Sequence, residues 1–281
     1  MIDQVAELSA VRLRLLSLVE SFGSCAVAMS AGVDSAVVAK AAHLALGNRA
    51  VAITGVSASL AAGELDEARA VARQIGIRHE SLDTDEFASP SYIRNAPDRC
   101  YHCKTELYTQ IRAAADRLGL AVIANGANAD DTGDYRPGMT AASEHNVRSP
   151  LLELGITKAQ VRELAAFWEL PVWDKPASPC LSSRVAYGES VTPERLAMID
   201  QAEAWLKEQG LSVVRVRYHT GDLARVEVPP EAIGRISTPP IRDELVALLK
   251  SLGFKFITLD LEGFRSGSQN ALLPILDAAQ Q

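Results

Sequence analysis

Short apolar runs alternate with segments of helical periodicity through the first half of the chain. Apolar runs at 25–29 and 50–56 predict strands buried on both faces, and two more strands are expected at 77–82 and 120–124. Apolar residues recur at helical spacing in four other segments, at 5–22, 36–46, 64–75 and 105–118. Strand alternating with helix is typical of an α/β fold, a parallel sheet with helices on both faces. In such a sheet the ligand lies beyond the carboxyl ends of the strands.

The pattern changes after about residue 184. The expected elements there are a hairpin of 213–219 and 223–228, helices over 193–209 and 241–252, and a strand over 254–261. The first hairpin strand alternates between an apolar face and a basic face. These elements form a small α+β unit, large enough for a core of its own. We therefore predict two domains, an α/β domain over 1–185 and an α+β domain over 186–281.

Composition and charge narrow the class of protein. The 281 residues are 48% hydrophobic and 22% charged, with a net charge of −7, which argues against a protein that wraps a nucleic-acid backbone. Four cysteines are too few for a disulfide scaffold. The N-terminus lacks the basic-then-apolar order of a signal peptide, and no apolar run approaches the ~20 residues of a membrane span. We expect a cytoplasmic protein with reduced thiols and no membrane partner.

A loop of small residues follows the first predicted strand. It reads Ser30-Ala31-Gly32-Val33-Asp34-Ser35 and leads into a helix. Small residues allow the backbone to approach a ligand closely, and the amide groups at a helix N-terminus attract anions. The loop lacks the Lys-Ser/Thr ending of a Walker loop, so a nest that grips pyrophosphate is the alternative. Asp34 fits such a nest if it holds Mg²⁺. An ordinary turn of small residues remains the simpler interpretation of the loop alone.

This loop resembles the SGGxDS signature of the PP-loop ATP pyrophosphatase superfamily, with Ala31 at the usual second glycine. A methyl group is tolerated there if the backbone φ is negative. The segment 126–131 resembles the second PP-loop element. The resemblance implies a Rossmann-like fold and the formation of an adenylate with release of pyrophosphate. It also implies Mg²⁺ ligands at Asp34 and Asp131, and ATP contacts from Ser30, Gly32, Val33, Asp34, Ser35 and Gly126.

Three cysteines lie in segments rich in Pro, Ser and Asp. Cys100 and Cys103 form a CxxC pair, and Cys180 follows Pro179. We expect both stretches to be loops on the active-site side, whereas Cys25 lies in an apolar strand and is interpreted as a core residue. Three thiolates can hold a 4Fe-4S cluster with one open iron. Structural zinc, with His102 or an acid as fourth ligand, and a redox disulfide are the alternatives.

Four further motifs resemble the LarE family of ATP-dependent sulfur transferases. They occur in the same order as in that family and are Asp134-Tyr135-Arg136-Pro137-Gly138, Ser182-Ser183-Arg184, Val214 to Arg217, and Leu259 to Gly267. The resemblance implies sulfur transfer to pyridinium-3,5-biscarboxylic acid mononucleotide, the precursor of the nickel-pincer nucleotide of lactate racemase. The substrate carboxylates are adenylated and then converted to thiocarboxylates, with release of AMP.

The resemblance also bears on the source of sulfur. Some members of the family sacrifice the sulfur of a single cysteine, and others use CxxC plus a later cysteine to bind a 4Fe-4S cluster that presents a sulfide. This chain has the three-cysteine pattern, and Pro179 stands where the sacrificial cysteine would be. That favours the cluster, with Cys100, Cys103 and Cys180 as ligands. A sacrificial Cys180 stays open. The catalytic residues are then these three cysteines and Asp34.

Basic residues supply candidates for the substrate phosphate. Arg215 and Arg217 are two apart on a predicted strand and share a face, and Arg265 in a Gly/Ser loop can join them. Guanidinium groups suit a nucleotide phosphate, and a solvated strand face is the alternative explanation of the pair. The resemblance adds Lys104 as a phosphate contact and Glu203 as a residue facing the substrate pocket.

Rival functions are a PP-loop tRNA thiolase, an amidotransferase of the NAD or GMP synthetase type, and a non-enzymatic ATP sensor. A thiolase is expected to carry a basic groove, which a net charge of −7 does not suggest. An amidotransferase has no need of the CxxC pair. The LarE resemblance further implies a homo-oligomer, a hexamer.

Overall fold

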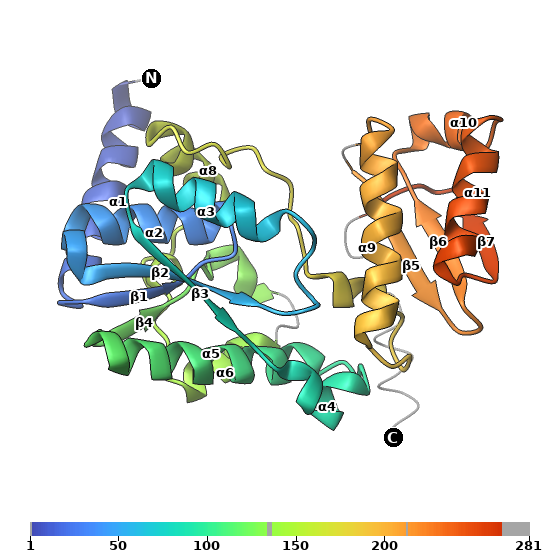
Figure 1. Ribbon diagram of the computed structural model, residues 1–281. Helices are drawn as coiled ribbons and strands as arrows, with labels where there is room; N and C mark the ends of the chain where they lie inside the picture. The colour runs from blue at the N-terminus through green and yellow to red at the C-terminus, as the bar shows by residue number, and fades with distance from the viewer. Residues whose placement is uncertain (1, 134–136, 212, 266–281) are drawn as a thin grey trace. The chain divides into compact units, whose positions relative to one another are not determined.

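Four parallel strands form the sheet of the larger part of the molecule (Figure 1). They run in the order β3-β2-β1-β4. Their bounds are β1 Cys25–Ala28, β2 Ala50–Val56, β3 Arg78–Asp83 and β4 Val122–Ala124. All three pairings are parallel, so the predicted α/β fold is confirmed. The computed structural model describes residues 2–133, 137–211 and 213–265. Asp134, Tyr135, Arg136, Ser266 and Gly267 of the sequence motifs lie outside these ranges.

The chain divides into two units. Unit 1 consists of Met1–Ser57, Gly63–Glu86 and Cys100–Ser178. Unit 2 takes Ala58–Ala62, Phe87–Arg99 and the chain from Pro179 onward. Within the described residues, no helix is both long and apolar enough to cross a membrane.

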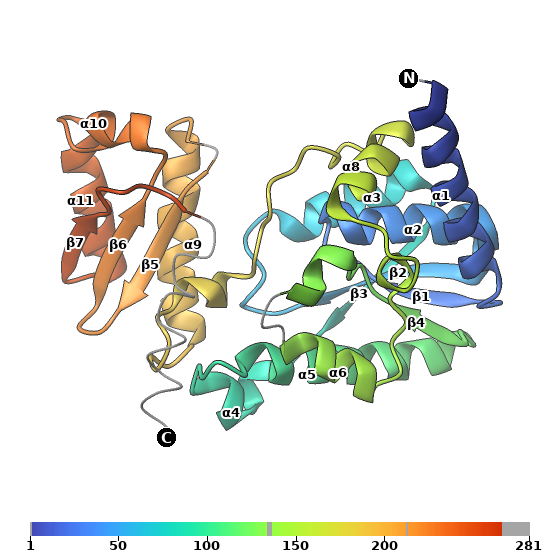
Figure 2. The same ribbon diagram turned by 180° about the vertical axis from the view of Figure 1, so that it is seen from behind.

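Helices cover both faces of the unit 1 sheet (Figures 1 and 2). One face carries α1 Ile2–Glu20, α2 Val33–Leu46, α3 Glu64–Ile75 and α8 Lys158–Phe167. The other carries α5 Arg99–Leu118 and α6 Pro137–Glu144. The short elements of unit 1 are α7 Pro150–Glu153 and the 3-10 turns Gly47–Arg49 and Ala129–Gly133. The 3-10 turn Glu86–Ala88 spans the boundary between the units, and α4 Pro90–Ile93 belongs to unit 2.

Each face of the sheet has its own apolar core. On one face Leu15 and Val37 are fully buried with Cys25 and Val27 of β1. On the other, Ile111 of α5 is buried with Ala26. Successive residues of β1 thus enter opposite cores, which explains the continuous apolar run. Burial raises the pKa of the Cys25 thiol to about 12, so this cysteine is the inert core residue predicted from its position.

Unit 2 contains a second, three-stranded sheet in the order β5-β6-β7. β5 Arg215–His219 and β6 Leu223–Glu227 form the predicted antiparallel hairpin, and β7 Phe256–Leu259 lies parallel to β6. Its helices are α9 Pro193–Glu208, α10 Ile233–Ile236 and α11 Ile241–Leu252, with 3-10 turns at Leu181–Arg184 and Pro230–Ala232. α9 begins at the Thr192 cap, whose hydroxyl accepts from Arg195 N, and packs on β5 and α11.

Several predicted boundaries differ by two or three residues, and the largest difference concerns the cysteines. The expected helix over 105–118 begins six residues earlier, at Arg99. Cys100 and Cys103 therefore lie in the first turns of α5 and not in a loop. The residues of this extension are polar or charged apart from the cysteines and Tyr101, so apolar periodicity gave no signal for them.

Candidate functional site

The loop from Ser30 to Asp34 joins β1 to α2 at the carboxyl end of the central strand. Gly32 caps the helix in an extended conformation, with φ −77° and ψ 154°. The Ser35 hydroxyl donates to Gly32 O at 3.0 Å and accepts from Ser30 N at 3.2 Å. Ser35 thus holds the loop from inside, while Ser30 is exposed and Gly32 half-buried at the helix N-terminus. The arrangement suits an anion, since helix N-termini carry orphan amides and a partial positive charge.

Ala31 has a left-handed backbone. Its φ is +55°, so the condition under which a methyl group would be tolerated without strain is not met. Left-handed φ costs an L-residue roughly 1–2 kcal/mol, which is why glycine is the usual occupant. The methyl group is fully buried, and this contact offsets part of the strain. The strained residue lies beside the proposed phosphate position.

Gly126, after β4, touches the first turn of α2. A Cβ at Gly126 would lie 2.7 Å from Ser35 N and 2.9 Å from Asp34 C, both rigid backbone atoms. Only glycine allows this approach. It follows from the sheet order, because β4 is the neighbour of β1 and their carboxyl ends meet at one edge. The two PP-loop elements seen in the sequence therefore meet in the fold.

Asp34 is held by two residues from other segments. Asn128 Nδ2 donates to Asp34 Oδ1 at 3.0 Å, and Lys158 Nζ forms an ion pair with Oδ2. The same two partners are fixed in turn, since Asp131 Oδ2 accepts from Asn128 N at 3.0 Å and Asp130 Oδ2 accepts from Lys158 N at 2.7 Å. Asn128 and Lys158 were not predicted. Lys158 is 124 residues from Asp34, and no local pattern marks it.

A magnesium ion fits the donors found here. Asp34 and Asp131 both offer carboxylate oxygens, the ligands Mg²⁺ prefers, and each is half-buried. Among the described residues no group of three or more His, Cys, Asp or Glu side chains forms a ready metal site. Mg²⁺ commonly takes only one or two carboxylates and completes its shell with phosphates and water. Lys158 pairs with one Asp34 oxygen, and an ion at this carboxylate would have to displace it.

Lys175 is a second basic residue of unit 1 that the sequence did not single out. Its Nζ lies 2.6 Å from Glu67 Oε2, 3.2 Å from Glu64 Oε2 and 3.4 Å from Ala31 O. Ser178 Oγ also donates to Glu64, at 2.8 Å. These bonds fix the segment that ends unit 1 to the start of α3 and to the strained loop residue.

The candidate cysteines belong to different units. Cys100 and Cys103 lie three apart on α5 in unit 1, and Cys180 lies in unit 2, where it caps a 3-10 turn. All four cysteines are described and reduced, and Cys100 and Cys180 are exposed. Positions i and i+3 share a helix face, so Cys100 and Cys103 can bind one group together. Lys104 follows them, half-buried, with its Nζ 6.0 Å from the Tyr108 ring centre.

A buried ion pair between Arg184 and Glu203 holds the backbone of the Cys180 segment. Arg184 binds Glu203 through two bonds of 3.0 Å each. It also donates to Cys180 O at 3.0 Å and to Pro179 O. Glu203, only 1% exposed, accepts from Val216 N as well. Its carboxylate therefore lies inside unit 2 and links α9, β5 and the cysteine segment.

Arg215 and Arg217 are buried side chains, 8% and 6% exposed, and not a solvated strand face. Arg217 binds Glu227 Oε2 at 2.8 Å and donates to Ser183 O at 3.1 Å. Burial, and then the charge of Arg184, lower the pKa of Arg215 to about 10, so its guanidinium stays protonated at neutral pH. It lies over the Phe264 ring at 5.1 Å, while Arg265 pairs with Glu262 at an exposed position.

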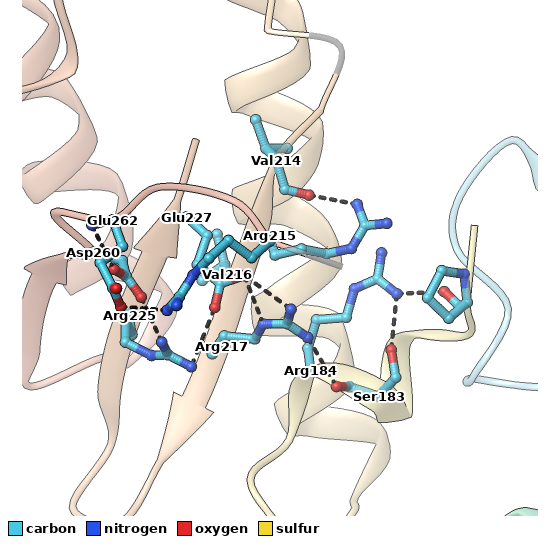
Figure 3. A network of polar contacts seen from close by, with 12 residues as sticks. Ser183, Arg184, Val214, Arg215, Val216, Arg217, Arg225, Glu227, Asp260 and Glu262 are labelled. Carbon is cyan, nitrogen blue, oxygen red and sulfur yellow. Dashed lines mark hydrogen bonds and ion pairs between the residues drawn. The ribbon is translucent and has the colours of Figure 1, made fainter. Parts of the chain in front are cut away.

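Figure 3 shows a band of charges across unit 2. Arg225 continues it, with bonds to Glu227 at 3.2 Å and Asp260 at 2.6 Å. The band consists of four arginines and three carboxylates, namely Arg184, Arg215, Arg217, Arg225, Glu203, Glu227 and Asp260. Its positive excess is suited to an anionic ligand.

Comparison with known proteins identifies the family. No family model matches the chain. It is 48% identical to the uncharacterised protein slr1717 of Synechocystis over 88% of its length and 92% of that protein. It is 35% identical to the pyridinium-3,5-bisthiocarboxylic acid mononucleotide synthase of Lactiplantibacillus plantarum over 96% of its length and 97% of the synthase. The chain belongs to the LarE family.

More distant relatives agree. The tRNA-specific 2-thiouridylase MnmA of Rickettsia felis is 28% identical over 58% of this chain and 55% of its own length. LarE proteins and these thiouridylases are ATP-dependent enzymes that insert sulfur, and the chain is an ATP-dependent sulfurtransferase.

We predict that Gly126→Ala lowers the free energy of unfolding by about 1–3 kcal/mol, because its methyl group would collide with the backbone of α2. It should also weaken ATP binding, because α2 must move. Urea unfolding and ATP titration measure the two effects. Gly234→Ala is the control, since a Cβ there meets open space. Equal behaviour of the two variants would refute the close approach.

We predict that Glu227→Gln destabilises the protein by about 3–5 kcal/mol, because it leaves Arg217 buried beside a neutral amide. The exposed pair of Arg265 and Glu262 provides the control, and Glu262→Gln should cost less than about 1 kcal/mol. Both values come from urea unfolding. A cost for Glu227→Gln as small as that for Glu262→Gln would show that the band is not a buried network.

Proposed function

We propose that the chain adenylates the carboxylates of pyridinium-3,5-biscarboxylic acid mononucleotide and converts them to thiocarboxylates, a step in nickel-pincer nucleotide biosynthesis. The observation that carries this proposal is the coverage of the synthase relative, which matches 96% of the chain and therefore both units. The tRNA thiouridylase relatives match 54–58% of the chain. A net charge of −7 also favours a small substrate over tRNA.

The first half of the reaction is assigned to the PP-loop. The helix N-terminus at Gly32 and Val33, with the Ser30 and Ser35 hydroxyls, binds the ATP phosphates, and Gly126 leaves room for them. A substrate carboxylate oxygen attacks the α-phosphorus, the bond to the bridging oxygen breaks, and pyrophosphate leaves. Mg²⁺, when bound by Asp34 and Asp131, would offset the charge of the leaving group. Asn128 and Lys158 orient Asp34 for this task.

The ion pair with Lys158 also offsets the charge of Asp34 in the protein without bound metal. A carboxylate at a site built for phosphates repels them unless its charge is offset. The ion pair with Lys158 supplies that offset in the ligand-free protein. Asp34 would hold Mg²⁺ when that ion is bound, and the Lys158 ammonium group would then be available to a phosphate oxygen.

The second half of the reaction requires sulfur. We assign Cys100, Cys103 and Cys180 as ligands of a 4Fe-4S cluster. The donor set fits, because the thiols are reduced, two of them share one helix face, and Cys180 is exposed. The cluster, when bound, would supply an open iron for the sulfide that replaces AMP. Sacrifice of the Cys180 sulfur is the alternative, and both routes use the same adenylate.

The basic band is assigned to the substrate phosphate. The main cations for this phosphate are Arg215 and Arg217. Lys104 and Arg265 are further contacts that attract it. Glu203 supports them indirectly, since it neutralises Arg184 and fixes the backbone of β5 at Val216. The positive excess of the band selects a phosphate-bearing acceptor over a neutral one.

We predict that Asp34→Asn abolishes pyrophosphate release from ATP in the presence of the acceptor, by roughly a hundredfold or more. The neutral amide is a much weaker Mg²⁺ ligand than the carboxylate, and it loses the ion pair with Lys158. Pyrophosphate release and thiocarboxylate mass measure the effect. Asp66→Asn, an exposed acid at the start of α3, is the control and should retain full activity. Release by Asp34→Asn at the control rate would remove the metal role.

We predict that anaerobic reconstitution gives about four iron atoms per chain, and that Cys100→Ser, Cys103→Ser or Cys180→Ser each lowers this number strongly. Cys25→Ala should keep the iron, because Cys25 is a core residue. Iron and sulfide assays with the visible spectrum provide the measurement. No iron in the wild-type chain, with loss of one sulfur from Cys180 after a single turnover, would instead support the sacrificial route.

A further inference from the structure

A cavity of about 430 Å³ lies between α3 and β3 in unit 1, and the proposed reaction does not use it. The residues that line it are Arg69, Ala72, Arg73, Ile77, His79 and Ser81. No residue of the PP-loop is among them. Cavities of roughly 300–1,000 Å³ commonly hold small organic ligands. The cavity is therefore a candidate for a second ligand site in this unit.

The two walls of the cavity follow from the periods of a helix and a strand. Arg69, Ala72 and Arg73 are three and four positions apart, so they share one face of α3. His79 and Ser81 are two apart on β3 and therefore share a face of that strand. β3 ends the order of the described four-stranded sheet, so the cavity lies at the edge of that sheet.

The lining of the cavity is basic. It includes two arginines and no acidic side chain. Arg69 pairs with Asp66 at 3.1 Å, but the Asp66 side chain is 82% exposed, and water weakens such a pair. Within residues 2–133, 137–211 and 213–265, the Arg73 guanidinium group forms no ion pair or hydrogen bond. Two guanidinium groups, one of them without a protein partner, favour an anionic ligand.

The base of the cavity is apolar. Ala72 and Ile77 are 1% and 5% exposed and supply carbon atoms there. An inorganic anion would leave these atoms uncovered, whereas an organic molecule with one anionic group would cover them and reach the arginines. A phosphate group matches the donors better than a carboxylate does, since two guanidinium groups and the Ser81 hydroxyl can serve three terminal oxygens.

His79 connects the cavity with the residue before the PP-loop. Its Nε2 lies 2.9 Å from Thr54 Oγ1, and that hydroxyl donates to Met29 O at 2.8 Å. Because the hydroxyl has one proton, His79 Nε2 is the donor to Thr54. Burial, and then the charge of Arg69, lower the pKa of His79, so the ring is uncharged at neutral pH. The NMR signals of this ring can therefore report an anion in the cavity.

We propose that this cavity binds a small phosphate monoester with an apolar or aromatic portion, at a site distinct from the PP-loop. Arg69 and Arg73 bind the phosphate, Ser81 donates to it, and the apolar portion lies on Ala72 and Ile77. The proposal goes beyond the proposed function, because this site takes no part in adenylation or in sulfur transfer.

The experiment uses the full chain labelled with nitrogen-15 at its five histidines, of which His79→Gln assigns the relevant signal. AMP is the probe, and inorganic phosphate and adenosine are titrated separately. We expect AMP to shift the His79 signal to saturation and to bind at least tenfold more tightly than either of the others. Arg73→Gln should raise the dissociation constant of AMP at least tenfold. Arg78→Gln, which removes an equal charge from an exposed residue paired with Glu80, should leave it unchanged.

Arg73→Gln also separates this cavity from the PP-loop, which can bind AMP as well. A His79 shift that Arg73→Gln leaves unchanged would place the ligand at the PP-loop and overturn the proposal. Equal binding of AMP and inorganic phosphate would overturn the monoester, and the absence of a saturable shift would overturn the site.

Arg73 and Arg78 are exposed, so both variants should fold, and circular dichroism checks this. Arg69→Gln replaces Arg73→Gln if the latter does not fold. Pyrophosphate release from ATP should be the same in Arg73→Gln as in the unaltered chain. Loss of that release would show that the cavity belongs to the ATP site and would overturn the proposal. Because AMP binding is measured without acceptor or iron, its failure is distinct from failure of the proposed function.

Discussion

The approach of Gly126 to the first turn of α2 is the constraint on which the nucleotide site depends. With a backbone nitrogen 2.7 Å from where a Cβ would be, the loop after β4 lies directly on the loop after β1. This contact brings Asn128 to Asp34 and positions the acids of the Ala129–Gly133 turn. A side chain at this point would separate two elements that must act together. The absence of a side chain at Gly126 is therefore as necessary to the site as its carboxylates are.

A different constraint governs unit 2, where charges are buried in pairs. Burying an ion is costly unless a partner and further hydrogen bonds compensate. Arg184 meets this requirement with Glu203 and with carbonyls of the cysteine segment. The hydrogen bonds that compensate the buried charge also fix the backbone, since the oxygens that accept from the guanidinium group belong to Pro179 and Cys180. Stability and placement of the thiol come from the same bonds.

The sequence predicts the parts of this molecule that local patterns specify. Buried strands, the hairpin of unit 2, the phosphate loop and the core position of Cys25 follow from hydrophobic period or from residue type, and the structure contains each. The start of α5 did not follow, because its first turns lack an apolar stripe. The φ of Ala31, which decides whether its methyl group is tolerated, also does not follow from residue type, and the structure gives it as +55°.

Most of the other features that the sequence does not predict depend on contacts between residues far apart in the chain. Lys158 and Lys175 lie 124 and 144 residues from the loop residues they contact, and nothing near them in the chain marks either as a site residue. The side chains of Asn95 and Arg99 behave in the same way, since they bind the carbonyls of Ala186 and Ser182, which follow 91 and 83 positions later. Such partners can be identified only from the folded structure.

The central claim, that this PP-loop activates a carboxylate by adenylation before sulfur is transferred, has one direct test. The acceptor carboxylates are labelled with oxygen-18, and the AMP released during thiocarboxylate formation is weighed by mass spectrometry. Attack of the carboxylate on the α-phosphorus predicts that each AMP carries a labelled oxygen from the acceptor. Unlabelled AMP, or release of ADP and phosphate in its place, would contradict the account.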